Sequence, residues 1–184
     1  IKDFGNYKIA LVGVTRFSFD KKNKPGPAKD SLSNLKIVIK KLKKDNCFVI
    51  IYFHWGFEYV PYPAPRDRRM AHKCIDYGAD LIVGAHPHIM QGFEKYKDKH
   101  IFYSLGNFIY DPKVFDGISY YENDMRLFKS FALSINIQDN NKYNYQIHPY
   151  KFTKQNVELL QDKEKDDLIK EFYEISEVFN FPYM

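Results

Sequence analysis

Three of the six histidines in this sequence stand directly after apolar segments. His54 follows the run Cys47 to Phe53, and His86 and His88 follow the run Asp80 to Val83. Neutral imidazole is a common protein ligand for Zn, Mn or Fe. In an extended segment, residues two apart send their side chains to the same face. The spacing therefore predicts a divalent metal site, in which His86 and His88 share one ion or each bind one of a close pair.

A hydrogen-bonded loop histidine is the alternative role for each of these three side chains. The remaining histidines do not follow such apolar runs: His72 belongs to a helical pattern, His100 precedes a strand-like segment, and His148 lies in an alternating segment. We expect those three to be structural or surface residues.

The apolar segments before the metal candidates indicate strands of one parallel sheet. Tyr7 to Val14, Cys47 to Phe53 and Asp80 to Val83 are nearly continuous apolar runs, and helical patterns at about Ser31 to Lys44 and Arg66 to Tyr77 separate them. Strand, helix and strand in succession favour right-handed parallel crossovers. Because ligands collect beyond the carboxyl ends of parallel strands, the three histidines are predicted to converge at one edge.

The second half of the chain has the pattern of antiparallel strands and one helix. Gln91 to Tyr96 and His100 to Ser104 are short strand candidates, and Lys129 to Ile137 with Tyr143 to Tyr150 forms a hairpin pattern. A C-terminal amphipathic helix is indicated by apolar residues at helical spacing, which are Leu168, Phe172, Ile175 and Phe179. Two polar segments, 21–27 and 139–142, are expected loops. We predict one α/β domain over residues 1–184, a central sheet with parallel units plus an antiparallel hairpin.

Composition excludes several classes of protein. The 184 residues are 45% hydrophobic and 28% charged, which is a globular balance. The longest apolar run is too short to span a membrane, and Cys47 and Cys74 are expected to be buried free thiols. The net charge of +5 comes largely from the 31–44 helix. We expect this helix to pack through Leu35, Val38 and Leu42 and to expose Lys36, Lys40 and Lys43, so nucleic-acid binding is not expected.

Other residues near the expected sheet edge have candidate roles in binding. Trp55 is predicted to line a substrate pocket, and the alternative is that it packs against neighbouring residues. Glu58 is predicted to orient a ligand histidine through its other nitrogen, or to be a surface residue. Asn107, after a glycine, reaches substrate or supports a turn. Three arginines at the start of a helix are expected to be solvated, with contact to an anionic substrate as the alternative: Arg66, Arg68 and Arg69.

Three blocks of this sequence resemble the bacterial capsule-synthesis CapA family, which is associated with poly-γ-glutamate capsule biosynthesis. They are HWGFEY (54–59), RRMAHKCIDYGADLIVGAHPHIMQGFEKY (68–96) and IFYSLGNFIYD (101–111). The family belongs to the calcineurin-like metallophosphoesterase superfamily. The resemblance implies that His54 and His86 bind one metal and that His88 binds the other, with Mn, Zn or Fe as the expected ions.

The resemblance also implies a role at the outer face of the cell envelope, with capsule-synthesis machinery as partner and an anionic polymer or phosphoester as substrate. Metals would lower the pKa of a bound water and stabilise an in-line displacement. The alternatives are a non-catalytic envelope assembly component with an incomplete metal site and a single-ion site with three histidines.

The sequence departs from the superfamily pattern before its first strand. The earlier ligand motifs are absent, and Gly5 and Asn6 are followed by Tyr7 where a histidine is expected. A close pair of metal ions needs a bridging carboxylate, and Asp80 precedes its strand at the opposite edge. The chain also opens at Ile1 without an initiating Met. We therefore expect the C-terminal half of a metallophosphoesterase-like domain, with its site completed by an upstream half or a partner chain.

Overall fold

The computed structural model describes residues 1–5, 7–17, 31–109, 114–115, 118–119, 124–138, 142–153 and 156–180. In this part of the chain a six-stranded sheet has the order β1-β2-β3-β4-β6-β5. Its strands are β1 (Lys2–Asp3), β2 (Lys8–Thr15), β3 (Cys47–His54), β4 (Leu81–Ala85), β5 (Met90–Tyr96) and β6 (Lys99–Leu105). Strands β2, β3, β4 and β6 are parallel, whereas β1 and β5 pair antiparallel at the two ends.

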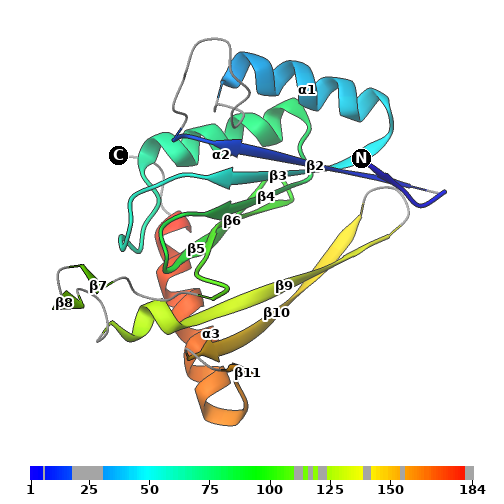
Figure 1. Cartoon of the computed structure of the whole chain (residues 1–184). Helices are drawn as coiled ribbons and strands as arrows, with labels where there is room; N and C mark the ends of the chain where they lie inside the picture. The colour runs from blue at the N-terminus through cyan, green and yellow to red at the C-terminus, as the bar shows by residue number, and fades with distance from the viewer. Residues whose placement is uncertain are drawn as a thin grey trace.

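Two helices cover one face of the six-stranded sheet (Figure 1), and they are α1 (Leu32–Lys44) and α2 (Pro65–Tyr77). On the other side lie an antiparallel sheet of β9 (Lys129–Ile137), β10 (Tyr143–Phe152) and β11 (Val157–Leu159), and the helix α3 (Asp162–Ser176). Two 3₁₀ turns, η1 (Met125–Phe128) and η3 (Glu177–Asn180), precede β9 and follow α3. A small pair is formed by β7 (Val114–Phe115) and β8 (Ile118–Ser119). The predicted α/β class, with parallel units and an antiparallel hairpin, is confirmed.

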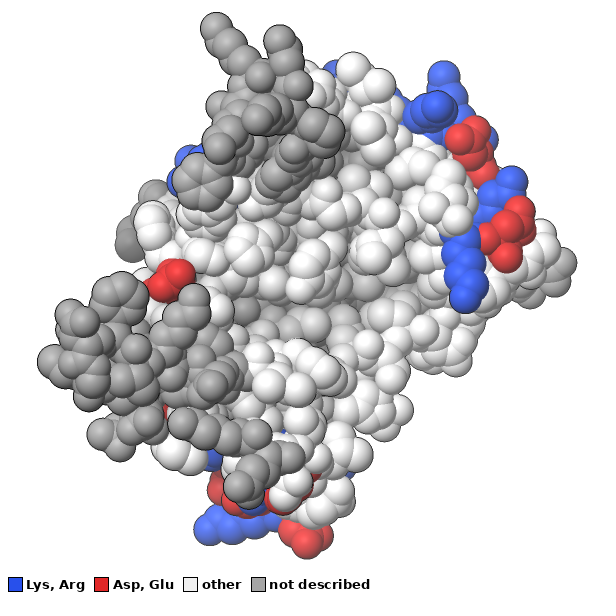
Figure 2. Space-filling view, viewed as in Figure 1, with Lys and Arg blue, Asp and Glu red and all other residues white. Residues whose placement is uncertain are grey.

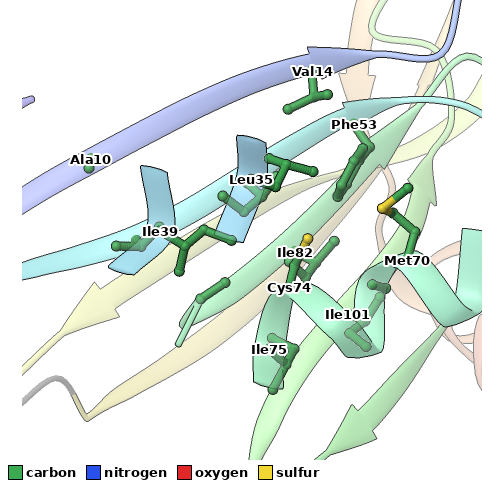
Figure 3. Close-up of a cluster of buried hydrophobic side chains, with 14 of the residues drawn as sticks. Ala10, Val14, Leu35, Ile39, Phe53, Met70, Cys74, Ile75, Ile82 and Ile101 are labelled. Carbon is green, nitrogen blue, oxygen red and sulfur yellow. The ribbon is translucent and has the colours of Figure 1, made fainter. Parts of the chain in front are cut away.

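Helix α1 begins where the sequence indicated, because the Ser31 side chain accepts a hydrogen bond from the Asn34 backbone N–H at 3.5 Å. Its buried residues are Leu35, Ile39 and Leu42. The prediction that Val38 packs inward was wrong, since it is 38% exposed and Ile39 takes the core position. The i, i+4 spacing from Leu35 points to Ile39, which lies between both helices and the sheet (Figure 3).

Lys43 was also placed wrongly, because its ammonium is half-buried and held in an ion pair. Its Nζ donates to the Asp80 carboxylate at 2.6 Å and to the Cys47 carbonyl at 3.0 Å. The long side chain reaches across the amino edge of the sheet, where Asp80 is 3% exposed. Lys36 and Lys40 are exposed as expected.

Helix α2 is bounded by a proline and a glycine. Pro65 occupies its first turn, and Gly78 ends it with a φ of +113°, a left-handed conformation that favours glycine. Its inner face contributes Met70, Cys74 and Ile75 to a first hydrophobic core, which lies between the two helices and the six-stranded sheet (Figure 3). Cys47 and Cys74 are buried and free, as predicted.

The second core lies between the six-stranded sheet and the β9–β10 hairpin. Phe48, Leu81 and Phe102 from the sheet meet Phe131 and Phe172. In the C-terminal helix Leu168 and Phe172 are buried as expected, whereas Phe179 lies beyond it in η3. The expected loops at 21–27 and 139–141 lie outside the described residues. This core holds the hairpin against the strands that carry the histidines.

Charged side chains lie mainly at the rim of the face seen in Figure 2, where Lys and Arg alternate with Asp and Glu. Its middle is largely uncharged among the residues described. No helix in the described ranges is long and apolar enough to cross a membrane.

Candidate functional site

The three candidate metal ligands gather at the carboxyl edge of the parallel strands. His54 is the last residue of β3 and pairs with Ala85, the last residue of β4. His86, the next residue after Ala85, therefore lies beside His54. The ring centroids of His54 and His86 are 4.7 Å apart, and those of His86 and His88 are 6.1 Å apart. The three imidazoles are neighbours at one edge of the sheet, as expected, whereas the convergence of their ring nitrogens and their role as ligands stay predictions.

The backbone that carries His86 and His88 is not extended, contrary to the expectation. His86 has a φ of +102° and His88 a φ of +63°. Such left-handed conformations are costly for residues with a Cβ and persist where the surroundings impose them. The backbone N–H of Tyr59 donates to the Pro87 carbonyl at 2.8 Å, which ties this turn to the loop after β3. The histidines converge because the turn coils back, not because their side chains share one face of a strand.

Arg16 and Phe17, which sequence analysis did not single out, also lie at the cluster. The Arg16 backbone N–H donates to the His54 carbonyl at 3.0 Å. The Phe17 ring lies 4.3 Å from the His86 ring and 5.9 Å from the His54 ring, centroid to centroid. The strand register could have indicated both residues. Thr15 pairs with His54 in the parallel β2–β3 pair, so the residues that follow Thr15 must lie at the same edge of the sheet as His54.

Burial makes the imidazoles of His54 and His86 harder to protonate. The pKa of His54 is lowered by burial and then by His88. Burial is also the largest cause that lowers the pKa of His86, followed by His54, while Glu58 acts in the opposite direction. Both rings are therefore neutral at neutral pH, the form that coordinates a metal.

His88 is held by the amide of Asn107. The His88 Nδ1 and the Asn107 Oδ1 are 2.7 Å apart, and the Asn107 Nδ2 donates to the Leu127 carbonyl at 3.1 Å. Tyr59 stacks on the other side, with ring centroids 5.9 Å apart. Asn107 is 8% exposed, so both ends of its amide lie inside the protein. Substrate binding by Asn107 stays a prediction, and the contact with His88 is one that its sequence position did not indicate.

Trp55, the residue after His54, packs into the interior of the protein. It is 2% exposed, stacks on Phe53 with centroids 4.2 Å apart, and donates its indole N–H to the Tyr103 carbonyl at 3.0 Å. A Cβ at Gly84 would overlap the same Tyr103 carbonyl, so β4 and β6 approach closely only because residue 84 is glycine. This burial favours the packing role of Trp55, and its predicted contact with substrate stays untested.

Two carboxylates lie near this edge, and one was missed. Glu58, in the loop after β3, is close enough to influence His86. Asp67, in the first turn of α2, is 2% exposed, and its Oδ1 lies 3.4 Å from the Arg16 guanidinium. Its position at a helix start above the carboxyl edge was the signal that could have found it.

Asp80 lies at the opposite edge of the sheet, as expected. There its carboxylate forms ion pairs with Lys43 and Lys99. Over the described ranges, no group of three or more His, Cys, Asp or Glu side chains is arranged to hold a metal ion. The donors are neighbours without a preformed coordination shell.

The prediction that Arg68 is solvated was wrong. Its guanidinium donates to both oxygens of Glu94 at 2.8 and 3.1 Å, and Tyr103 donates its hydroxyl to the same carboxylate at 2.6 Å. His72, one turn further along α2, also meets this carboxylate, with its Nε2 3.0 Å from Glu94. Arg66 and Arg69 are exposed as expected.

The other histidines have the structural partners expected of them. His72 stacks on Tyr96 with centroids 3.8 Å apart. His100 Nδ1 lies 2.9 Å from the Tyr143 hydroxyl, and His148 Nε2 lies 2.8 Å from the Ser134 hydroxyl.

A mostly parallel sheet, helices on one face, an antiparallel sheet on the other and histidines at the carboxyl edge together fit part of a metallophosphoesterase-like domain. Comparison with protein families identifies the chain further. It belongs to the family described as bacterial capsule synthesis protein PGA_cap, whose model matches residues 1–112. The matched range contains the three histidines and Asn107.

Curated relatives carry names from the same field. The capsule biosynthesis protein CapA of Bacillus anthracis is 51% identical over 73 residues, 39% of this chain and 18% of that protein. The PGA biosynthesis protein CapA of Bacillus subtilis (strain 168) is 43% identical over 107 residues, 56% of this chain and 28% of that protein. A probable polyglutamine synthesis accessory protein of Mycobacterium tuberculosis is 31% identical over 85 residues, 46% of this chain and 22% of that protein. The matches thus span less than a third of each of these relatives.

Proposed function

We propose that this chain takes part in the biosynthesis of a capsule polymer of the poly-γ-glutamate type at the cell envelope. We further propose that its histidine cluster binds a divalent metal ion used to hydrolyse a phosphoester or related bond. The family membership supports the first part, together with relatives named for capsule, PGA and polyglutamine synthesis. The second part rests on one observation, the meeting of His54, His86 and His88 at the carboxyl edge.

The chemistry of the donor set fits a metal such as Zn, Mn or Fe. Burial lowers the pKa of His54 and His86, which keeps their nitrogen lone pairs available at neutral pH. When bound, a divalent ion lowers the pKa of coordinated water and polarises a phosphoryl oxygen. Arg16 adds a partly exposed guanidinium near this edge, and its side chain is 25% exposed. We assign it the task of attracting an anionic substrate.

A second metal ion would need ligands from outside the described residues. We propose that they come from another part of the longer protein or from a partner chain in the capsule-synthesis machinery. The short share of each relative covered by this chain is consistent with that arrangement.

The experiment compares metal binding and hydrolysis in matched variants. The chain is titrated with Zn²⁺ and Mn²⁺ by calorimetry and assayed on a generic phosphoester, alone and in a longer form that restores upstream sequence. His88→Ala should weaken binding about 10-fold or more, whereas His148→Ala in the hairpin should leave it unchanged. We expect little turnover by the short chain and more by the longer form. Equal turnover by both, abolished by His88→Ala, would show that the site is already complete.

A non-catalytic assembly component is the second candidate, because no preformed group of three ligands exists in the described ranges. It is distinguished by elemental analysis of the longer form. A purified longer protein without metal, unable to bind added Zn²⁺ yet required for capsule formation, would favour this alternative.

A further inference from the structure

The contact between His88 and Asn107 specifies a proton position that coordinates alone do not show. A neutral imidazole carries one proton, on either Nδ1 or Nε2, and the partner at one nitrogen decides which. Here the partner of Nδ1 is the side-chain amide of Asn107 at 2.7 Å. An amide presents an acceptor at its oxygen and a donor at its nitrogen, so its orientation fixes the tautomer.

The orientation of the amide is set by a third group. The Leu127 carbonyl, which can only accept, lies 3.1 Å from the other end of the Asn107 amide. If the amide were reversed, its oxygen would face the Leu127 carbonyl oxygen and two acceptors would meet in the interior. The NH₂ group therefore points to Leu127, the oxygen points to His88, and Nδ1 must be the protonated ring nitrogen.

The supports of this amide come from three separate elements. Leu127 is fully buried in η1, and Tyr150 on β10 donates its hydroxyl to the Asn107 backbone carbonyl at 2.7 Å. Before Asn107, Gly106 has a φ of +85°, and a Cβ there would overlap the Ser130 hydroxyl. The chain therefore passes through a turn that only glycine fits, and the second sheet fixes the amide from behind.

We propose that Asn107 is a positioning residue that holds His88 in the Nδ1–H tautomer and so directs the basic Nε2 to the histidine cluster. The tautomer follows from the hydrogen bonds themselves. Its use in metal binding rests on the proposed function. A buried amide with both ends engaged can hold the ring in one orientation, as partners of ligand histidines commonly do.

The test measures the tautomer directly in the metal-free protein. Long-range ¹H–¹⁵N correlation spectra of ¹⁵N-histidine-labelled chain, at about pH 9 where the rings are neutral, distinguish protonated from unprotonated ring nitrogens. The His88 signals are assigned by their loss in His88→Gln. We expect protonated Nδ1 in the unmodified chain. A proton on Nε2 would overturn the proposal, whether or not any variant folds.

Three variants separate positioning from general support. Asn107→Ala removes the acceptor and should shift His88 toward the Nε2–H form that predominates in free imidazole side chains. Asn107→Asp restores an acceptor and should restore the Nδ1–H form. Tyr150→Phe removes a support of the same backbone without touching the amide, and it should keep the tautomer. An unchanged tautomer in Asn107→Ala, or an equal change in Tyr150→Phe, would refute the assignment.

Zn²⁺ titration of the same proteins tests the link to the site. Asn107→Ala should weaken Zn²⁺ binding by about 10- to 100-fold, and Tyr150→Phe by far less. If the unmodified chain shows the expected tautomer but binds no Zn²⁺, the proposed metal function fails while the positioning of His88 stands. If Zn²⁺ binds equally well to Asn107→Ala, the positioning does not serve the metal and that part of the inference fails.

Discussion

Replacing Glu94 with Gln should remove about 3 to 4 kcal/mol of stability at neutral pH. The carboxylate is 6% exposed and accepts hydrogen bonds from Arg68 and Tyr103. Burial raises its pKa, but the bonds from His72, Arg68 and Tyr103 outweigh burial and hold the pKa at about 2, against an ordinary value of 4.5. A difference of roughly 2.5 pKa units at about 1.4 kcal/mol each corresponds to about 3 to 4 kcal/mol.

The pH dependence has a definite sign. Because the pKa of Glu94 is lower in the folded chain than in the unfolded chain, its contribution is complete above about pH 5. It is lost progressively as pH falls from about 4.5 through about 2, and only below that range is the carboxyl protonated in both the folded and the unfolded chain. Urea titrations of the unmodified chain and Glu94→Gln should thus differ most at pH 7 and converge in acid.

Glu164→Gln is the matched control for this series. Glu164 also accepts a hydrogen bond from a basic side chain, Lys151, at 2.8 Å, but this pair is exposed. The control should follow the unmodified chain within experimental error at every pH. A gap for Glu94→Gln that stays constant down to pH 2.5, or one no larger than that of the control, would refute the reasoning.

Three further outcomes are expected. Ile39→Ala should cost about 2 to 5 kcal/mol in denaturant titrations and Val38→Ala about 0.5 or less, and equal costs would contradict the observed inner face of α1. Gly84→Ala should lower stability by about 1 to 3 kcal/mol through overlap with the Tyr103 carbonyl, measured as a fall in Tm, and an unchanged Tm would contradict it. If Zn²⁺ binds as proposed, its affinity should fall less on mild acidification than that of free imidazole, because burial lowers the pKa of His54 below its ordinary value; an equal or steeper fall in calorimetric titrations would contradict this.

The strands and the edge that bears the histidines were predictable because both follow from local pattern. The apolar runs before His54 and His86 are long enough to mark buried strands, and helical spacing between them sets the parallel crossover. Once two strands are parallel neighbours, their carboxyl ends must meet. The position of the cluster follows from those two steps without any knowledge of side-chain contacts.

Pairings between distant segments were not predictable in the same way. Arg68 faces inward because Glu94 lies on the edge strand β5, and nothing in the helical pattern marks that partner. Asn107 meets His88 across a strand hairpin, while Glu58, expected to orient a histidine, influences His86 only through its charge. Each case depends on where a second strand places a polar group, which local periodicity does not encode.

The balance of charge at the histidine edge bears on how many metal ions this chain can hold. Two cations about 3.5 to 4 Å apart repel each other and need an anionic ligand between them. Asp67 is the buried carboxylate near this edge, but its charge is already opposed by Arg16 at 3.4 Å. Glu58 remains, and its charge raises the pKa of His86 against the effect of burial. Under the proposed metal function, one divalent ion is therefore easier to place at this edge than two, and the described residues hold no group of three ligands already arranged for it. A second ion would require a carboxylate supplied from elsewhere in the protein or by a partner.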